Sequence, residues 1–110
     1  MKLQNNDDLE TRIIKTFVDV LILKHLKKSP LKSGYQILRY LHGELNMSFS
    51  PATVYHAIYL LERKNLIQCH GDQNGRIYAL TDQGEQTLKL TADSSTKIQT
   101  LVDRILSETK

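Results

Sequence analysis

The sequence changes from a helical to a strand pattern once, at residues 64–67, and this change constrains the fold more than any other feature. After it, residues 66–70 and 76–80 predict two strands of a β-hairpin, joined by the turn-forming segment 71–75. Before it, four apolar residues recur at the i, i+3, i+4, i+7 spacing of a helix with one buried face: Val54, Ala57, Ile58 and Leu61. A helix that leads directly into a hairpin indicates the α+β class.

The helix before this change has clear start and stop signals. Ser50 is a favoured N-cap residue, and Pro51 suits the first helical position because its missing N–H would have no partner there. Asn65 readily adopts the left-handed conformation that ends a helix. We therefore predict a helix from Ser50 to about Lys64.

Two further helices precede it. Apolar residues at helical spacing predict a first helix over residues 9–27, which Ser29 and Pro30 end. Ser33 and Gln36 have the spacing of a capping box at the start of a second helix. The predicted buried face of that second helix carries Tyr35, Leu38, Leu41 and Leu45.

A last helical region follows the hairpin. Thr81, Asp82 and Glu85 favour a helix start, and the polar run 91–96 leaves open whether one helix continues to the end. Three helices, a hairpin and a C-terminal helix form the element order of a winged helix-turn-helix. The fold class is thus mainly α with a small β-hairpin, a winged helix-turn-helix plus a C-terminal dimerisation helix. We expect a DNA-binding domain over 1–84 and a dimerisation helix over 85–110.

Composition indicates a single globular domain with a modest basic surplus. The 110 residues carry a formal net charge of +3. Between residues 20 and 43 there is no acidic side chain but there are five basic ones: Lys24, Lys27, Lys28, Lys32 and Arg39. Such a segment fits a polyanionic partner, or simply a solvated lysine-rich surface. No apolar stretch is long enough for a membrane span or a secretory signal, so we expect a cytoplasmic protein.

Nothing in the sequence indicates catalysis, a metal or a cofactor. Cys69 is the single cysteine, and the four histidines (His25, His42, His56 and His70) lack the close spacing of metal ligands, so we read all but His56 as surface residues. There is also no nucleophile elbow, phosphate loop or dinucleotide fingerprint. We therefore expect no enzyme activity.

The outward face of the helix after Ser50 is the main candidate site. If the apolar face points inward, Thr53 and Tyr55 flank an outward row made of Ala52, His56, Tyr59 and Arg63. This mixture of small, polar and basic groups suits a DNA groove, although an ordinary solvated face would also fit. The amide groups of Ala52 and Thr53, at the positive end of the helix, are placed to hold a phosphate.

Two other segments are candidates for phosphate contact. Lys32 and Ser33 stand beside the amide groups of Gly34 and Tyr35 at the start of the second helix, which predicts a phosphate clamp. In the hairpin, which would form the wing, Arg76 is the only arginine or lysine that could reach DNA. Because a wing that contacts DNA usually presents several such residues, DNA contact by the wing is the weaker prediction.

Four segments together resemble the PadR-like family of winged-helix transcriptional regulators. They are residues 30–38, with Gly34-Tyr35; 50–55, with Ser50 and Thr53; 61–67, with Leu61-Glu62; and 76–84, with Tyr78 and Gly84. The chain departs from the family pattern at four positions. Ala52 and Asn65 replace glycines, His56 replaces a proline, and Leu60 stands where a basic residue is common.

The resemblance implies a dimeric repressor that binds double-stranded DNA. A small-molecule effector can release such a repressor from the DNA. Dimer contact would come from a C-terminal apolar stripe, supplemented by the first helix. These residues are Ile98, Leu101, Val102, Ile105 and Leu106, with Leu9, Ile13 and Phe17. The alternative is a winged helix used for protein–protein contact, with Tyr55, Tyr59 and Leu60 as anchors.

Overall fold

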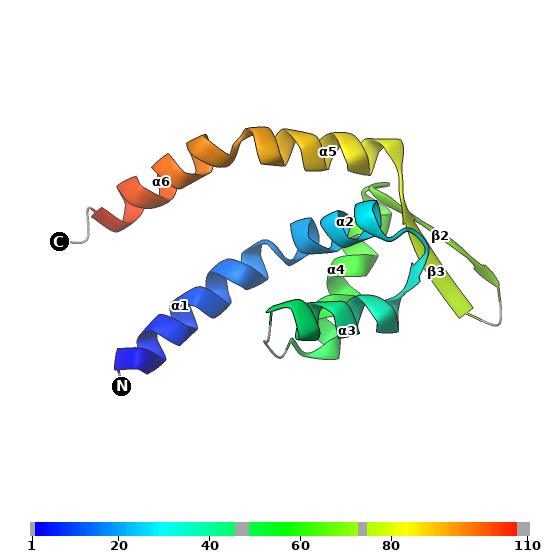
Figure 1. Ribbon diagram of the computed structural model, residues 1–110, viewed down its shortest axis with the longest axis horizontal. Helices are drawn as coiled ribbons and strands as arrows, with labels where there is room; N and C mark the ends of the chain where they lie inside the picture. The colour runs from blue at the N-terminus through cyan, green and yellow to red at the C-terminus, as the bar shows by residue number, and fades with distance from the viewer. Residues whose placement is uncertain (1, 46–48, 73–74, 108–110) are drawn as a thin grey trace.

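A computed structural model describes residues 2–45, 49–72 and 75–107 (Figure 1). It confirms a mainly helical chain with a small antiparallel sheet. In order, the elements are α1 (Lys2–Thr16), α2 (Val18–Lys28), β1 (Lys32–Ser33), α3 (Gly34–Leu45), α4 (Pro51–Arg63), β2 (Ile67–Asp72), β3 (Gly75–Leu80), α5 (Asp82–Asp93) and α6 (Ser95–Ser107).

The sheet contains the predicted hairpin and one strand that the sequence did not reveal. β2 and β3 pair from Ile67↔Leu80 to Asp72↔Gly75, so the strands take in part of the expected turn, and residues 73 and 74 lie outside the described residues. β1 pairs with the other edge of β3 through Lys32↔Tyr78 and Ser33↔Ile77. Two residues are too few to show the alternation that marks a strand.

The predicted first helix is wrong in one respect, because two helices occupy its place. The break falls at Phe17, whose φ of −107° and ψ of 17° depart from helical values. The Asp19 side chain accepts the Val20 N–H at 2.8 Å, which helps α2 to begin again. A second break at Ser94 separates α5 from α6 and answers the question left open for the C-terminal region.

The core gathers under α2, α3 and α4, with two strand residues closing it. Tyr35 is 60% exposed, so its predicted place on the buried face of α3 is wrong; Ile37 lies there instead and is fully buried. The buried apolar residues are Val18, Ile22, Leu23, Leu26, Ile37, Leu38, Leu41, Phe49, Val54, Ala57, Ile58, Leu61, Ile67 and Tyr78.

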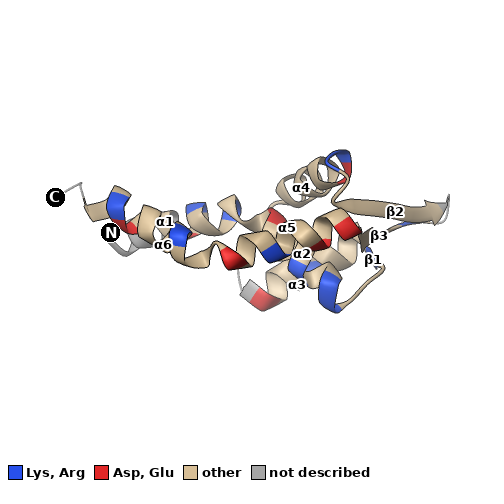
Figure 2. Ribbon diagram, turned by 90° about the horizontal axis from the view of Figure 1, so that it is seen from above, with Lys and Arg blue, Asp and Glu red and all other residues tan. Residues whose placement is uncertain are grey.

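Helices α1 and α6 project from the end of the molecule opposite the hairpin, and both views show them there (Figures 1 and 2). The molecule is accordingly elongated, at 54 × 31 × 21 Å. α6 buries no residue, and neither does α1 among residues 9–16. None of the helices within the described residues is long and apolar enough to cross a membrane.

Candidate nucleic-acid interface

Helix α4 begins as the sequence predicts. The Ser50 side chain accepts the Thr53 N–H at 3.1 Å, and Pro51 is the first helical residue. At the other end, Asn65 has a φ of 63°, in the left-handed region expected after the last turn. One expectation changes here: the Thr53 N–H is held by Ser50, so of the two predicted phosphate-binding amides only that of Ala52 stays outside this cap.

The predicted outward row of α4 is exposed. Ala52, His56, Tyr59 and Arg63 all face solvent, while the four apolar residues of the opposite face are buried. The Arg63 guanidinium donates to the Tyr59 hydroxyl at 3.2 Å and lies 5.7 Å from the centre of its ring. The His56 ring lies 6.4 Å from that of Tyr59. The row is thus a connected donor surface rather than three independent side chains.

The start of α3 contacts α4 through Tyr55, which lies in the second turn of α4. Its ring rests against Gly34, with about half of the side chain exposed. Consequently the N-terminus of α3 lies beside the second turn of α4.

The capping box at the start of α3 is present as predicted. The Gln36 N–H donates to the Ser33 hydroxyl at 3.1 Å, and the Ser33 N–H donates to the Gln36 side chain at 2.9 Å. The Ser33 groups are therefore engaged locally, which leaves Lys32 and the amides of Gly34 and Tyr35 as the better candidates for the phosphate clamp.

Arg39 is a candidate that the sequence analysis did not place in the site. Its guanidinium carbon lies 5.9 Å from the centre of the Tyr35 ring, and both side chains are exposed. Tyr35 and Arg39 are four residues apart on one helix, so their i, i+4 spacing could have revealed the pair.

Arg76 in the wing is tied back to the rest of the domain. Its guanidinium lies 3.4 Å from the Glu62 carboxylate on α4, and its Nε donates to the Tyr78 hydroxyl at 3.3 Å. The hydrogen bond to Tyr78, more than the charge of Glu62, raises the pKa of Arg76. The guanidinium therefore links the wing to α4, and it would exchange Glu62 for a phosphate if it contacted DNA.

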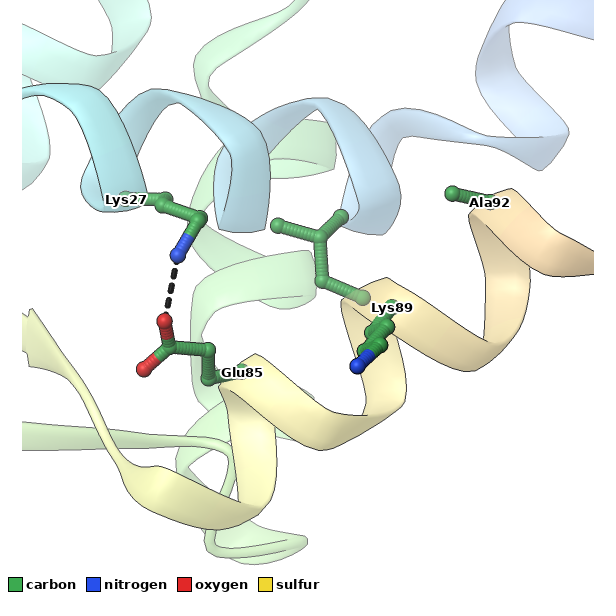
Figure 3. A pocket seen from close by; sticks show the side chains of 5 residues that line it. Lys27, Glu85, Lys89 and Ala92 are labelled. Carbon is green, nitrogen blue, oxygen red and sulfur yellow. Dashed lines mark hydrogen bonds and ion pairs between the residues drawn. The ribbon is translucent and has the colours of Figure 1, made fainter.

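One lysine of the basic segment between residues 20 and 43 faces α5 rather than the predicted interface. Lys27 points toward α5 and pairs with Glu85, which lowers the pKa of that carboxyl (Figure 3). The pair borders a pocket of about 420 Å³ between α2 and α5, lined also by Leu88, Lys89 and Ala92. Lysines and arginines are spread over several elements (Figure 2).

Two histidines read as surface residues are instead half-buried and partnered. His25 on α2 stacks on Tyr40 of α3 with ring centres 3.8 Å apart. His42 Nε2 lies 2.9 Å from the carbonyl oxygen of Phe49, just before the N-cap of α4. Both contacts join neighbouring parts of the fold: the first joins α2 to α3, and the second joins α3 to the residue before the N-cap of α4. Among the described residues, no three His, Cys, Asp or Glu side chains cluster as metal ligands would.

Helices α2, α3 and α4 are followed by the β2–β3 hairpin, and α3 and α4 form a helix-turn-helix pair in which α4 exposes one face. This arrangement defines a winged helix-turn-helix protein. Comparison of the sequence with protein-family models then matches residues 22–90 to the transcriptional regulator PadR-like family. This match spans more than half of the chain, and the chain therefore belongs to the PadR-like family of transcriptional regulators. No curated protein matches the sequence.

Solved structures share the fold over most of the chain. A transcriptional regulator from Clostridium thermocellum superposes with a TM-score of 0.72 at 22% identity, covering 84% of this chain and 93% of its own. A PadR family regulator from Clostridium difficile R20291 gives 0.63 at 26% identity, with 82% and 98% coverage. Bacillus subtilis PadR, solved in complex with operator DNA, gives 0.57 at 28% identity, with 64% and 44% coverage.

Proposed function

We propose that this chain is a sequence-specific double-stranded DNA-binding regulator that works as a homodimer and lays α4 in the major groove. The observation that carries the proposal is the exposed row His56, Tyr59 and Arg63 on a helix whose other face is fully packed. Hydrogen-bond donors on such a helix match the acceptors of base edges and phosphates. That a family member, Bacillus subtilis PadR, has been solved on operator DNA supports the same assignment.

The dimensions of α4 support its placement in the major groove. Its 13 residues give a length of about 20 Å at roughly 1.5 Å per residue, and a helix of normal diameter fits a groove about 12 Å wide. Around it we assign phosphate contact to Lys32, the α3 amides and Arg76, and base contact to His56, Tyr59 and Arg63.

The apolar stripes of α1 and α6 support self-association. A lone helix of 13 residues is marginal in water, and α6 has no fully buried residue within its own protomer. Ile98 and Phe17, the latter at the α1–α2 break, are half-buried. The remaining members of the predicted interface are between 38% and 59% exposed: Leu9, Ile13, Leu101, Val102, Ile105 and Leu106. A second copy of this chain would cover both stripes, with residues 85–110 as the main dimerisation segment.

Salt dependence is the decisive test of DNA binding. Fluorescence anisotropy on duplex fragments, preceded by selection from random duplexes, should give an affinity that falls with a log–log salt slope of about −0.9 per phosphate contact. Arg63→Ala should weaken binding. Lys89→Ala removes the same charge on α5, which α2 separates from α4 (Figure 1), and should leave binding unchanged. If the selection enriches no sequence, or if the two variants behave alike, the assignment of α4 is wrong.

Light scattering tests the dimer. Ile105→Glu places a charge in the α6 stripe and should give a monomer at micromolar concentration. Thr100→Glu adds the same charge on the opposite side of α6, about 140° away around the helix, and should stay dimeric. A wild-type monomer, or a dimeric Ile105→Glu protein, would refute the interface.

A protein–protein module is the second candidate, because Tyr55, Tyr59 and Leu60 are 44%, 51% and 39% exposed. Aromatic side chains of this kind anchor protein interfaces. That candidate predicts no salt-dependent duplex affinity. A palindromic operator is part of the proposed homodimeric mode of binding, because each protomer would place one α4 in a major groove. A repressor role and a small-molecule effector remain predictions from the family resemblance.

A further inference from the structure

We propose that Tyr55 and Gly34 act together as the spacer that sets the distance between α3 and α4, and that Tyr55 serves DNA binding through its ring rather than its hydroxyl. The inference rests on the proposed function, because the helices must meet the duplex together. It reassigns Tyr55, which the sequence places among the DNA-contacting residues, to a positioning role.

The Tyr55 ring leaves no room for a side chain at position 34. Gly34 is buried at the first position of α3, and a Cβ atom added there would lie 2.4 Å from Cε1 of Tyr55. Cδ1 and Cζ of the same ring would follow at 3.2 and 3.3 Å. One edge of the ring therefore occupies the space that any other residue at position 34 would need.

Tyr59, one turn further along α4, provides the contrast. The two tyrosines are similarly exposed, at 44% and 51%, yet their rings have different partners. Tyr59 accepts a hydrogen bond from Arg63 through its hydroxyl. Tyr55 instead places its ring carbons against the backbone of Gly34, which has no side chain. Exposure alone would give both the same role, whereas the contacts separate them.

The ring fixes one end of a helix pair whose other end is already fixed. At the turn between the helices, Phe49 is buried at 2% exposure and its carbonyl oxygen lies 2.9 Å from His42 of α3. At the opposite end the Tyr55 ring lies against Gly34. An aromatic ring is rigid, and close-packed groups transmit a change of size as displacement. These two contacts act together with the buried core residues of both helices, such as Ile37 and Val54, to set how α3 and α4 lie relative to each other.

This spacing matters for DNA because both helices would contact one duplex. The amides of Gly34 and Tyr35 at the start of α3 would hold a phosphate while α4 enters the groove. A change in the separation of the two helices removes one set of contacts when the other set forms. A variant with an altered distance between α3 and α4 should therefore bind duplex DNA with lower affinity, and its affinity should depend less steeply on salt concentration.

Four variants and two controls test the spacer by anisotropy at several salt concentrations, well below each variant's unfolding temperature as measured by circular dichroism. Tyr55→Ala removes the ring and Gly34→Ala fills its space, so each should lower affinity about tenfold and reduce the salt slope by about 0.9 or more. Tyr55→Phe keeps the ring and should bind within about twofold of wild type. The double variant Gly34→Ala with Tyr55→Ala should bind no worse than Tyr55→Ala, because both changes act on one contact.

The controls match the substitutions. Gly43→Ala makes the same change in α3 at a place where none of the described residues lies within 4 Å of the added Cβ, and it should leave DNA binding unchanged. Tyr59→Phe removes a hydroxyl that does have a partner, and it should weaken binding where Tyr55→Phe does not.

Each outcome decides the question. If Tyr55→Phe binds as weakly as Tyr55→Ala, the hydroxyl is the ligand and the spacer is wrong. Wild-type binding by Gly34→Ala means that the ring swings aside without moving α4, which also overturns it, as does additivity in the double variant. If the wild-type chain binds no duplex, the proposed function is wrong, and the spacer role, which depends on it, is wrong as well.

Discussion

Alanine substitutions at two glycines should change stability in opposite directions. Gly84 is buried in the first turn of α5, where an added Cβ would lie 2.1 Å from the carbonyl oxygen of Leu66 and 2.8 Å from Cδ1 of Leu80. The Leu66 carbonyl already accepts the Thr81 N–H at 3.1 Å, and the Thr81 hydroxyl accepts the Gly84 N–H at 2.9 Å. A methyl group at Gly84 therefore collides with a backbone that two hydrogen bonds hold in place.

The magnitudes follow from this geometry. A Cβ–oxygen distance of 2.1 Å must grow by about 1 Å, and overpacking against fixed groups costs about 1–3 kcal/mol or more. Gly43 lies exposed in α3, and within the part of the chain that the structure describes nothing lies within 4 Å of its added Cβ, so Gly43→Ala should gain about 0.5–1 kcal/mol of helix propensity. With about 2.1 cal/mol/K of unfolding entropy per residue, 110 residues convert these values to a fall of about 4–13 °C and a rise of about 2–4 °C in Tm.

Thermal unfolding followed by circular dichroism measures the Tm shifts of Gly84→Ala and Gly43→Ala. All proteins are compared at one protein concentration, because the Tm of a dimer depends on concentration. A Gly84→Ala protein as stable as wild type would show that α5 does not pack on the turn between α4 and β2 as described. A loss of stability in Gly43→Ala would show that this part of α3 faces a neighbour.

Three further predictions concern other strained or charged groups. Leu31 has a φ of 65° and is 52% exposed, so Leu31→Gly should raise the free energy of unfolding by about 0.5–1 kcal/mol in chemical denaturation; an equal loss would show that the side chain packs. Burial, and secondarily Lys32, lowers the pKa of His25 below its ordinary 6.5. Stability should thus be complete above pH 6.5 and fall as pH drops through the lowered pKa, and His25→Phe, which keeps the stack on Tyr40, should abolish this pH dependence of Tm. Glu62→Gln should release Arg76 and remove an acid beside the groove, raising DNA affinity in anisotropy; a lower affinity would mean that Glu62 holds the wing in its working position.

Local signals in the sequence predicted local structure well. The Ser33 capping box, the Ser50 cap and the Asn65 helix end all depend on residues within four positions of each other, so their physics is visible in a short window. The outward row of α4 follows from the same kind of reasoning, since one buried face fixes the other. Whether that row contacts DNA remains a prediction.

The features that the sequence did not reveal depend on distant parts of the chain. Periodicity continues through Phe17, so the break between α1 and α2 leaves no trace in the apolar pattern. Tyr35 fits the buried side of α3 by spacing, yet Ile37 fills that place once α2 and α4 pack against the helix. The partners of Lys27 and Arg76 lie 58 and 14 residues away, which is why charge counted along the chain overstated the free basic surface.

Because of these pairings, one protomer should hold DNA weakly, and dimerisation should supply much of the affinity. Among the described residues of the outward row on α4, Arg63 is the only formal cation, and Lys27 and Arg76 are already paired with carboxylates. Two protomers on one duplex double the phosphate contacts, so the salt slope of a dimer should be about twice that of a monomer. Ile105→Glu leaves the DNA-contacting residues intact, and it should therefore halve the slope in anisotropy, while Thr100→Glu should not. An undiminished slope in a variant that light scattering shows to be monomeric would mean that a single protomer carries the whole contact.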